Sequence, residues 1–274
     1  MKRWLTTTVA VLVCSAALRA DVTIVQTTTV EGGMAAMAAS NGAGPVSPKL
    51  TTRLKGTKSR TDVETGAVTV GTILDLTTKE VIVLRADQKT ATVATFVPPP
   101  AGTPPVTLKV DASITPTGKS QVLDGFTCNE YTFTTRMDMS EMTGRQMPPE
   151  AAAMMQGVTM VMQGSMWVTK DAPGAVEYLA FQKAATSGQL ASAALGASGM
   201  SVPGMDKLMK AMSAVEGVAY LTEMTLNVEG TGQFADMMKQ MGAMKIATRV
   251  NSIRSEPVSD DLFKVPEGYT VIKQ

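Results

Sequence analysis

The sequence predicts a mainly β protein of the α+β class, built around one antiparallel sheet. Three observations lead to this prediction. After residue 20 threonine and valine dominate, apolar and polar residues alternate with a period of two, and short turn sequences separate the alternating stretches. A chain of 274 residues, 44% of them hydrophobic, is long enough to bury a sizeable core. We therefore expect residues 21–274 to form a single domain.

The first half of this domain is predicted to consist of strands joined by short turns. Gly56 marks one turn, and Thr77 to Lys79 and Ala86 to Lys89 mark two more. A proline-rich segment, VPPPAGTPPV at 97–106, cannot join a sheet ladder and is expected to be a linker. The predicted strands before it are 21–30, two short strands within 49–64, 71–76, 80–84 and 90–97.

The second half is predicted to continue the sheet. Residues 106–110 and Ile114 are expected to flank a turn, and Tyr131 and Phe133 to share one face of a strand. The clearest half-buried strand is 220–229, where apolar residues alternate with Glu223, Thr225, Asn227 and Glu229. The further predicted strands are 127–137, a hairpin of 166–170 with 175–181 around the turn 171–174, and 245–253 as the partner of 220–229.

Helical patterns are fewer and lie in the second half. A short helix is predicted from Pro148 or Pro149 through Met154 and Met155. A stronger one begins at Pro203 and ends near Gly217, with residues 203–215 as its body. Residues 233–244 form a third candidate, and the Ala-, Gly- and Ser-rich stretches 31–48 and 183–202 are expected to be loops or frayed helices. One face of the 203–215 helix carries Met205, Leu208, Met209 and Met212 at i, i+3, i+4 and i+7.

The first twenty residues have the layout of a cleaved secretory signal peptide. Lys2 and Arg3 precede an uncharged stretch of about 14 residues, too short for the roughly 20 that span a bilayer. Cleavage is expected after Ala20, with Ala17 as the alternative. The sequence then predicts an exported, periplasmic protein, or a secreted one, without a transmembrane segment. Loss of Lys2, Arg3 and Arg19 leaves 22 basic and 24 acidic residues, a net charge of −2.

The 21 methionines are concentrated in two regions. None lies between residues 38 and 136, nine lie between 137 and 166, and nine more between 200 and 244. Three interpretations compete: irregular core packing, an adaptable cavity for acyl chains, and Cu(I) binding by thioethers. The Cu(I) interpretation rests on two clusters, Met137, Met139 and Met142, and Met237, Met238 and Met241.

Composition excludes much enzyme chemistry. The chain has no histidine, so it offers no Ser-His or Cys-His catalytic pair and no histidine zinc ligand. Its balanced charge does not favour nucleic acid as a partner. Neighbouring carboxylates, Asp138 with Glu141 and Asp260 with Asp261, lie in polar surroundings that indicate solvated side chains rather than an acid-base pair. We expect no enzymatic activity, no catalytic residue, no metal site among these groups and no cofactor.

Cys14 falls in the expected signal peptide, which leaves Cys128 as the single cysteine of the mature chain. No internal disulfide is then possible. Alternation places Cys128 on the face opposite Tyr131 and Phe133, unless a bulge near Asn129 turns it inward. We expect a small buried apolar residue rather than a nucleophile.

Several short motifs, in this order, resemble the DUF4412 family of exported bacterial proteins, within the LolA/LolB-like lipoprotein-carrier superfamily. DVTIVQTT at 21–28 resembles the opening strand of the family, and LKGTKSRTD at 54–62 resembles its KGxKxRxD motif. DLFKVPEGY at 261–269 resembles the closing dLFxvPxGY. The remaining similar segments are TILDLTTKEVIVL at 72–84, GFTCNEY at 125–131, and WVTKD at 167–171 followed by Glu177 and Tyr178.

The resemblance implies a strongly curved antiparallel half-barrel with a few helices over its concave face, LolA-like in architecture. It carries over no ligand-binding residue, and the methionine-rich insertions at 138–165 and 231–244 depart from the carriers.

Together these observations predict a non-enzymatic periplasmic protein that binds a lipid or another apolar ligand. Lipid or lipoprotein acyl chains are the expected partner. Two alternatives stay open: an envelope structural or stress-related interaction protein with a self-filled core, and Cu(I) binding by the methionine clusters. The predicted apolar site consists of Met154, Met155, Trp167, Met205, Leu208, Met209 and Met212.

Overall fold

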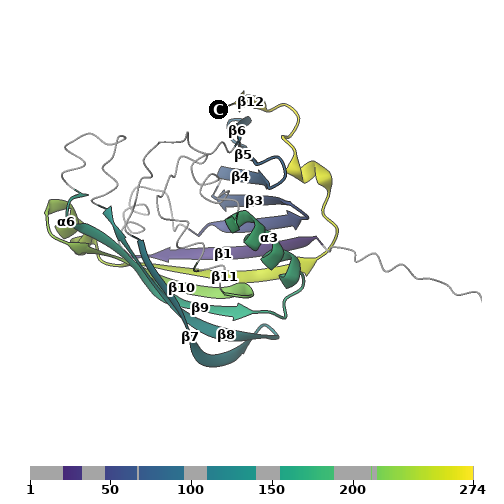
Figure 1. Ribbon diagram of the computed structural model, residues 1–274. Coiled ribbons are helices and arrows are strands. Elements are labelled where there is room, and N and C mark those ends of the chain that lie inside the picture. The colour runs from purple at the N-terminus through teal and green to yellow at the C-terminus, as the bar shows by residue number, and fades with distance from the viewer. Residues whose placement is uncertain are drawn as a thin grey trace, which may run out of the picture.

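The computed structural model describes residues 21–32, 47–66, 68–95, 110–139, 155–187, 211 and 215–273. In this part of the chain twelve strands form one sheet in the order β12-β6-β5-β4-β3-β2-β1-β11-β10-β9-β8-β7. Figure 1 shows a twisted, curved sheet, open rather than closed into a barrel, with helix α3 against one of its faces. The predicted mainly β class with an antiparallel sheet is therefore confirmed.

The first six strands form an antiparallel meander whose hairpins match the prediction. Gly56 and Lys79 take the left-handed backbone conformation that these tight turns require, with φ of 57° at each residue. The Asp75 carboxylate accepts a hydrogen bond of 2.8 Å from the Thr77 N–H and so fixes the second turn. The strands are β1 (Val22–Glu31), β2 (Lys49–Lys55), β3 (Lys58–Thr65), β4 (Val68–Asp75), β5 (Glu80–Arg85) and β6 (Thr90–Thr95).

The next five strands form a second antiparallel meander and include two corrections to the prediction. Ile114 lies inside one continuous strand rather than after a turn, because residues 110–123 pair with β8 along most of their length. The strand that contains Met166 starts as early as Val158, within a stretch expected to be an insertion. The strands are β7 (Val110–Leu123), β8 (Phe126–Asp138), β9 (Val158–Thr169), β10 (Val218–Gly230) and β11 (Met244–Ser255), the last two paired as predicted.

A single seam joins the two meanders. β1 pairs with β2 on one side and with β11 on the other, so residues more than 200 positions apart in sequence lie side by side at the centre of the sheet. After β11 the chain crosses to the far edge, where β12 (Thr270–Lys273) pairs in parallel with β6. The crossing segment, residues 256–269, contains the short 3-10 helix η3 (Asp260–Phe263) and is called the C-terminal strap below.

The predicted strand at 175–181 is wrong, because these residues begin the helix α3 (Ala175–Ser187). Ala175 is buried, Tyr178 and Gln182 are half-buried, and Ala185 is buried, which is the three-to-four-residue spacing of a helix face. Gly174 permits the helix at this place. Its φ is 72°, and a Cβ there would lie 2.3 Å from a methyl group of Val22 on β1.

The second helix is α6 (Gln233–Met241), which agrees with the prediction for 233–244 and ends at Gly242. The expected signal peptide, the proline-rich linker, the helix predicted from Pro148 or Pro149 to Met154 and almost all of the 203–215 helix lie outside the described residues. In the described part no helix is long and apolar enough to cross a membrane.

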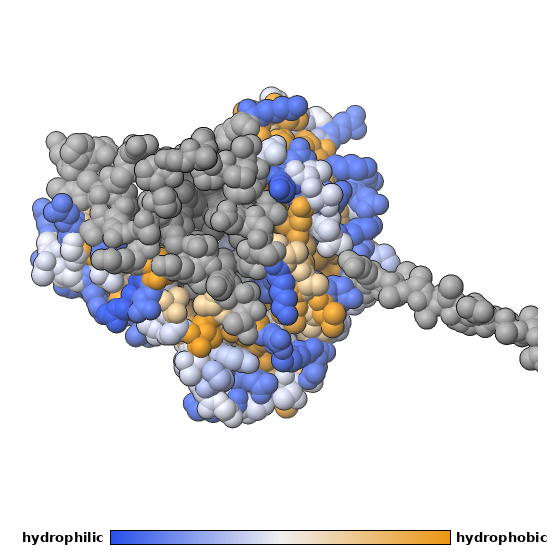
Figure 2. Space-filling model, viewed as in Figure 1, coloured by the Kyte–Doolittle hydropathy of each residue, from blue (hydrophilic) through white to orange (hydrophobic). Residues whose placement is uncertain are grey.

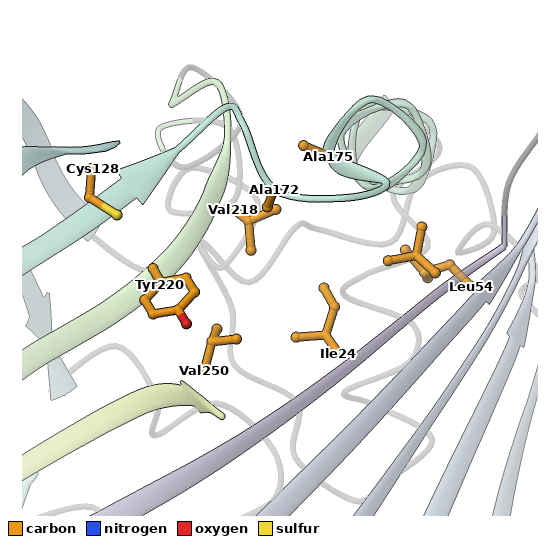
Figure 3. Packing of buried hydrophobic residues seen from close by; sticks show 9 residues of the cluster. Ile24, Leu54, Cys128, Ala172, Ala175, Val218, Tyr220 and Val250 are labelled. Atoms are coloured by element: carbon orange, nitrogen blue, oxygen red, sulfur yellow. The ribbon is translucent and has the colours of Figure 1, made fainter. Parts of the chain in front are cut away.

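The largest buried cluster lies between α3 and the central strands, as Figure 3 shows. It brings together Val22 and Ile24 of β1, Leu54 of β2, and Val218 and Tyr220 of β10. Cys128 is 0% exposed in this cluster, while Tyr131 and Phe133 pack in a different one with Met166 and Val168. The β8–β9 pairing starts at Asn129, and the β7–β8 register shifts between Pro116 and Ser120, the partners of Tyr131 and Asn129, so Cys128 lies beside an irregularity of the sheet.

Candidate functional site

One half of the sheet is amphipathic, and its apolar face is the candidate site. Strand register aligns apolar residues in three consecutive rows across β7, β8, β9 and β10, two of which continue onto β11 and one onto β1. We call this surface the apolar rows. The first row is Ile114, Phe133, Gly164, Met224, Ile246 and Val30, the second Ala112, Thr135, Met162, Leu226 and Met244, and the third Val110, Met137, Met160 and Val228.

Most side chains of the apolar rows are half-buried rather than buried. Val110 and Met137 are each 7% exposed and pack against Ala112, Met160 and Met162. The rest of the rows is intermediate in exposure apart from Thr135, which is 1% exposed. Five of the chain's methionines belong to these rows, and Met166 lies one row further along β9. The five are Met137, Met160, Met162, Met224 and Met244.

The opposite face of the same strands is polar. Residues between the apolar positions form rows such as Thr132, Ser165, Glu223, Ala247 and Thr29. This alternation is the arrangement of a sheet with one face turned to apolar material and one to water. A pocket of about 440 Å3 lies across β1, β8, β9, β10 and β11 and is lined mainly by residues of these polar rows.

Gly164 on β9 lies close against the main chain of β10. A Cβ atom at this position would collide with the main-chain oxygen of Glu223, and it would lie 2.8 Å from the Cα of Met224. The absence of a side chain therefore permits this close approach and leaves a gap in the first apolar row. Gly164 also lines the pocket on the polar face.

The structure separates the two predicted site residues that it describes. Trp167 lies near the end of β9 and packs, half-buried, against the cluster beneath α3. Met155 precedes the other end of β9 and is half-buried there. The remaining predicted residues, Met154, Met205, Leu208, Met209 and Met212, lie outside the described residues. Sequence reasoning missed the contribution of β7, β8, β10 and β11, which only the register reveals.

A polar latch fastens the tip of the β7–β8 hairpin to the centre of the sheet. Tyr220 Oη donates a hydrogen bond of 2.9 Å to Asp124, and Arg249 Nη2 donates to both carboxylate oxygens at 3.1 and 2.9 Å. The hydrogen bonds from Arg249 and then Tyr220 lower the pKa of Asp124. Burial, followed by the hydrogen bond to Asp124, raises the pKa of Tyr220 to about 12. Both groups are thus held in the states that maintain the latch.

Cys128 lies near this latch but is not activated. Burial raises the pKa of its thiol, and the Sγ donates only a weak hydrogen bond of 3.6 Å to the Phe126 carbonyl. A low-pKa thiolate is what a nucleophile or redox centre requires. The expected role as a small buried apolar residue agrees with this environment.

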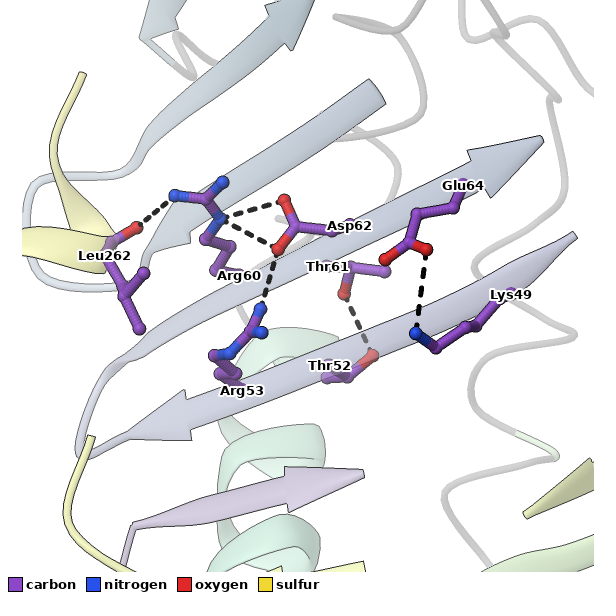
Figure 4. A network of polar contacts seen from close by, with 8 residues as sticks. All are labelled: Lys49, Thr52, Arg53, Arg60, Thr61, Asp62, Glu64 and Leu262. Atoms are coloured by element: carbon purple, nitrogen blue, oxygen red, sulfur yellow. Dashed lines mark hydrogen bonds and ion pairs between the residues drawn. The ribbon is translucent and has the colours of Figure 1, made fainter. Parts of the chain in front are cut away.

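The KGTKSRTD motif holds the C-terminal strap in place. Lys55 Nζ donates a 2.7 Å hydrogen bond to the Val258 carbonyl, and Arg60 Nη1 donates one of 2.9 Å to the Leu262 carbonyl. Asp62 in turn accepts from Arg60 and from Arg53, at 2.9 and 2.7 Å (Figure 4). The two motifs at 54–62 and 261–269 therefore contact each other, and their polar residues are engaged in structure.

The other candidate chemistry is weak in the described residues. They contain no group of three His, Cys, Asp or Glu side chains arranged to hold a metal ion. Asp260 pairs with Lys55 at 3.0 Å and Asp261 with Lys264 at 2.9 Å. Of the methionines considered for Cu(I), Met137 is buried in packing, and Met237, Met238 and Met241 lie on α6, where Met237 is 47% exposed. Met142 and Glu141 are outside the described residues.

Similarity to known proteins is found among solved structures. No protein-family model and no curated protein matches the chain. Among solved structures it is similar to an uncharacterised conserved protein from Thermus thermophilus, with 6% identity and a TM-score of 0.40 over 94% of this chain and 92% of the other. At that TM-score the similarity carries no argument about function.

Proposed function

We propose that this protein is a non-enzymatic binder of lipid acyl chains or similar apolar molecules, exported to the periplasm, with the apolar rows as its binding surface. The observation that supports this most strongly is the continuous apolar face across β7 to β11, with a polar face directly behind it. The proposal includes a LolA-like half-barrel in which the apolar rows line the concave side.

The chemistry of the rows suits an apolar occupant of variable shape. Methionine is unbranched and polarisable, so its side chain adapts to different partners better than leucine or isoleucine does. The rows contain no charged side chain, whereas Glu223, Thr225 and Asn227 on β10 all alternate onto the opposite face. An acyl chain can therefore lie on the rows without burying a charge.

Hydrophobic residues are also exposed outside the apolar rows. Figure 2 shows them in the middle of the view, where Figure 1 places α3 and the neighbouring strand ends, with hydrophilic residues on the surrounding elements. Apolar patches of this kind, rimmed by polar residues, are typical of ligand or partner sites. The periplasmic location rests on the signal-like layout of residues 1–20 and on the family resemblance.

Binding of a fluorescent fatty acid to the exported protein tests the proposal, together with native mass spectrometry after gentle purification. Leu226→Gln places a polar group in the second apolar row. We expect it to weaken binding by about tenfold or more, because the free energy gained by burying one leucine side chain corresponds to at least that factor. Thr225→Gln is the matched control, because the neighbouring residue points to the polar face. A protein that is always ligand-free and binds no apolar probe contradicts the proposal.

A second candidate is an envelope structural or stress-related interaction protein whose apolar rows are filled by its own chain. The burial of Val110, Met137 and Thr135 favours it, because part of the rows is already covered. The same titration separates the two functions. A self-filled face predicts no probe binding for the wild type and a loss of thermal stability in Leu226→Gln that added fatty acid does not restore.

A further inference from the structure

The pocket on the polar face has the dimensions and the charges of a second, separate binding site. Its volume of about 440 Å3 falls within the range of roughly 300–1,000 Å3 that is common for small-molecule sites. Most of its lining residues alternate onto the face opposite the apolar rows. A ligand here would therefore lie on the other side of the sheet from the proposed acyl-chain site.

Three charged side chains of alternating sign line this pocket. Glu31 on β1 is the direct cross-strand partner of Lys245 on β11, and Lys245 faces Thr225 on β10, two residues from Glu223. The order across the strands is therefore negative, positive, negative. In the described part of the chain none of these three side chains forms an ion pair with another residue, although opposite charges face each other in the register.

Neutral polar groups complete the lining. The Ser165 and Thr225 hydroxyls and the Gln163 amide come from adjacent strands and supply both donors and acceptors. Gly164 borders the pocket with its main chain only, since it has no side chain and its position in the register belongs to the first apolar row. Two members of the first apolar row, Met224 and Ile246, also line the pocket, since their strands form part of its wall.

We infer that this pocket binds a small zwitterion, a molecule with one ammonium group and one carboxylate or phosphate group. The two carboxylates would receive the ammonium group in charge-assisted hydrogen bonds, and the Lys245 ammonium would donate to the anionic group. A simple amine gains from Glu31 and Glu223 but is repelled by Lys245. A simple anion is attracted by Lys245 but repelled by both Glu31 and Glu223. Only a ligand with both charges satisfies all three groups.

Four small probes distinguish these possibilities. β-Alanine and 6-aminohexanoate are zwitterions of different lengths, propylamine carries only the ammonium group, and propionate carries only the carboxylate. Each is titrated into the exported protein at low salt and followed by backbone amide NMR shifts. We expect the zwitterions to shift amides around Ser165 and Glu223, more strongly than either single-charge probe, and the shifts to weaken with added salt because the site is open to solvent.

Two variants locate the binding. Glu223→Gln and Lys245→Met should each weaken zwitterion binding by roughly three- to tenfold, the range for partly exposed charge-assisted contacts. Glu267→Gln is the matched control, since Glu267 is an exposed carboxylate in the C-terminal strap far from β10 in the strand order. It should bind as the wild type does. Fatty acid binding should be unchanged in all three variants, which separates this site from the apolar rows.

Three results would overturn the inference. In the first, propylamine or propionate binds as tightly as the zwitterions or more tightly. In the second none of the four probes binds, and in the third Glu223→Gln and Lys245→Met bind the zwitterions as tightly as the wild type does. The first result reassigns the pocket to a cation or an anion. The other two remove it as a zwitterion site and leave the proposed acyl-chain function untouched.

Discussion

Asp124 shows how one side chain can fasten two distant parts of the sheet. It sits in the two-residue turn between β7 and β8, where Asp124 and Gly125 both have positive φ, of 47° and 90°. From there its carboxylate accepts hydrogen bonds from Tyr220 on β10 and Arg249 on β11. These bonds span β9, because β9 lies between β10 and the β7–β8 hairpin in the strand order. The latch therefore depends on the carboxylate being charged.

We predict that Asp124→Asn destabilises the protein at neutral pH and that this difference shrinks as the pH is lowered. The folded state lowers the pKa of Asp124, so its contribution to stability is present above the unfolded pKa of about 3.9 and is lost as pH falls through the folded value. Asparagine tolerates the positive φ, which leaves the turn intact. Urea unfolding at several pH values between neutral and acidic conditions measures the effect.

A constant difference between wild type and Asp124→Asn down to the most acidic condition would show that the charge of Asp124 is not what stabilises the latch. The side chain is half exposed, so added salt should also reduce the difference at neutral pH.

Individual residues differed in how well the sequence could predict them. The burial of Cys128 was expected from its residue type, because a free cysteine is small and apolar, whereas alternation only separated it from Tyr131 and Phe133. The partners of Lys55 and Arg60 did not follow, because Val258 and Leu262 lie about 200 positions away in the sequence. These two residues and Lys58 form a basic cluster near Gly56, and each of the three is paired with an acidic side chain in the fold.

At the scale of elements, the C-terminal strap is fixed by both polar and apolar contacts. Val258 and Phe263 are buried against Ile73, Leu84 and Ala91 of the first meander. In addition, Asp62 on β3 orients Arg60, which holds the Leu262 carbonyl (Figure 4). The Asp62 side chain is 12% exposed and those of Arg60 and Arg53 are 17% and 26% exposed, so this is a largely buried charge cluster.

We predict that Asp62→Ala lowers the free energy of unfolding by about 3 kcal/mol, because it leaves two arginines without their buried partner. Glu64→Ala is the matched control on the same strand. Glu64 pairs with Lys49 at 3.6 Å with both side chains more than 40% exposed, and its loss should cost less than about 1 kcal/mol. Urea denaturation of both variants gives the comparison. Equal costs would mean that the strap does not depend on this cluster.

Elements were predictable where local signals agreed with tertiary packing. The hairpins of the first meander and the β10–β11 pair combine alternation with turn residues, and the structure contains them at nearly the predicted bounds. Residues 175–181 were misassigned because Val176, Tyr178 and Phe181 have strand propensity. Packing decided the outcome, since a helix buries Ala175 and Ala185 against the sheet and leaves Val176 76% exposed.

The whole molecule consists of two meanders that share one sheet. β1 to β6 are contiguous in sequence, β7 to β11 are contiguous, and the β1–β11 seam unites them. Local patterns could predict the first meander and part of the second but not the seam, because nothing in a strand's own sequence identifies a partner more than 200 residues away. The apolar rows depend on the relative register of six strands, so they too emerged only from the assembled sheet.

The seam and the strap together predict that the two meanders stay associated without a covalent connection. A protease site inserted between residues 96 and 109 separates the chain into a piece with β1 to β6 and a piece with β7 to β12. We expect both pieces to elute together in gel filtration after cleavage, because ten residue pairs join β1 to β11 and the strap ties β11 to β12 at the opposite edge. Urea should separate them in one transition, since the seam and the strap belong to one cooperative sheet.

The Asp62→Ala variant provides the control for this experiment. With the cluster under the strap broken, cleaved pieces should separate at a lower urea concentration than cleaved wild type, whereas cleaved Glu64→Ala should match the wild type. Spontaneous separation of the wild-type pieces in buffer would contradict a continuous sheet through the β1–β11 seam. The apolar rows lie almost entirely in the second piece, so fatty acid binding measured on the cleaved complex also shows whether that surface requires the first meander.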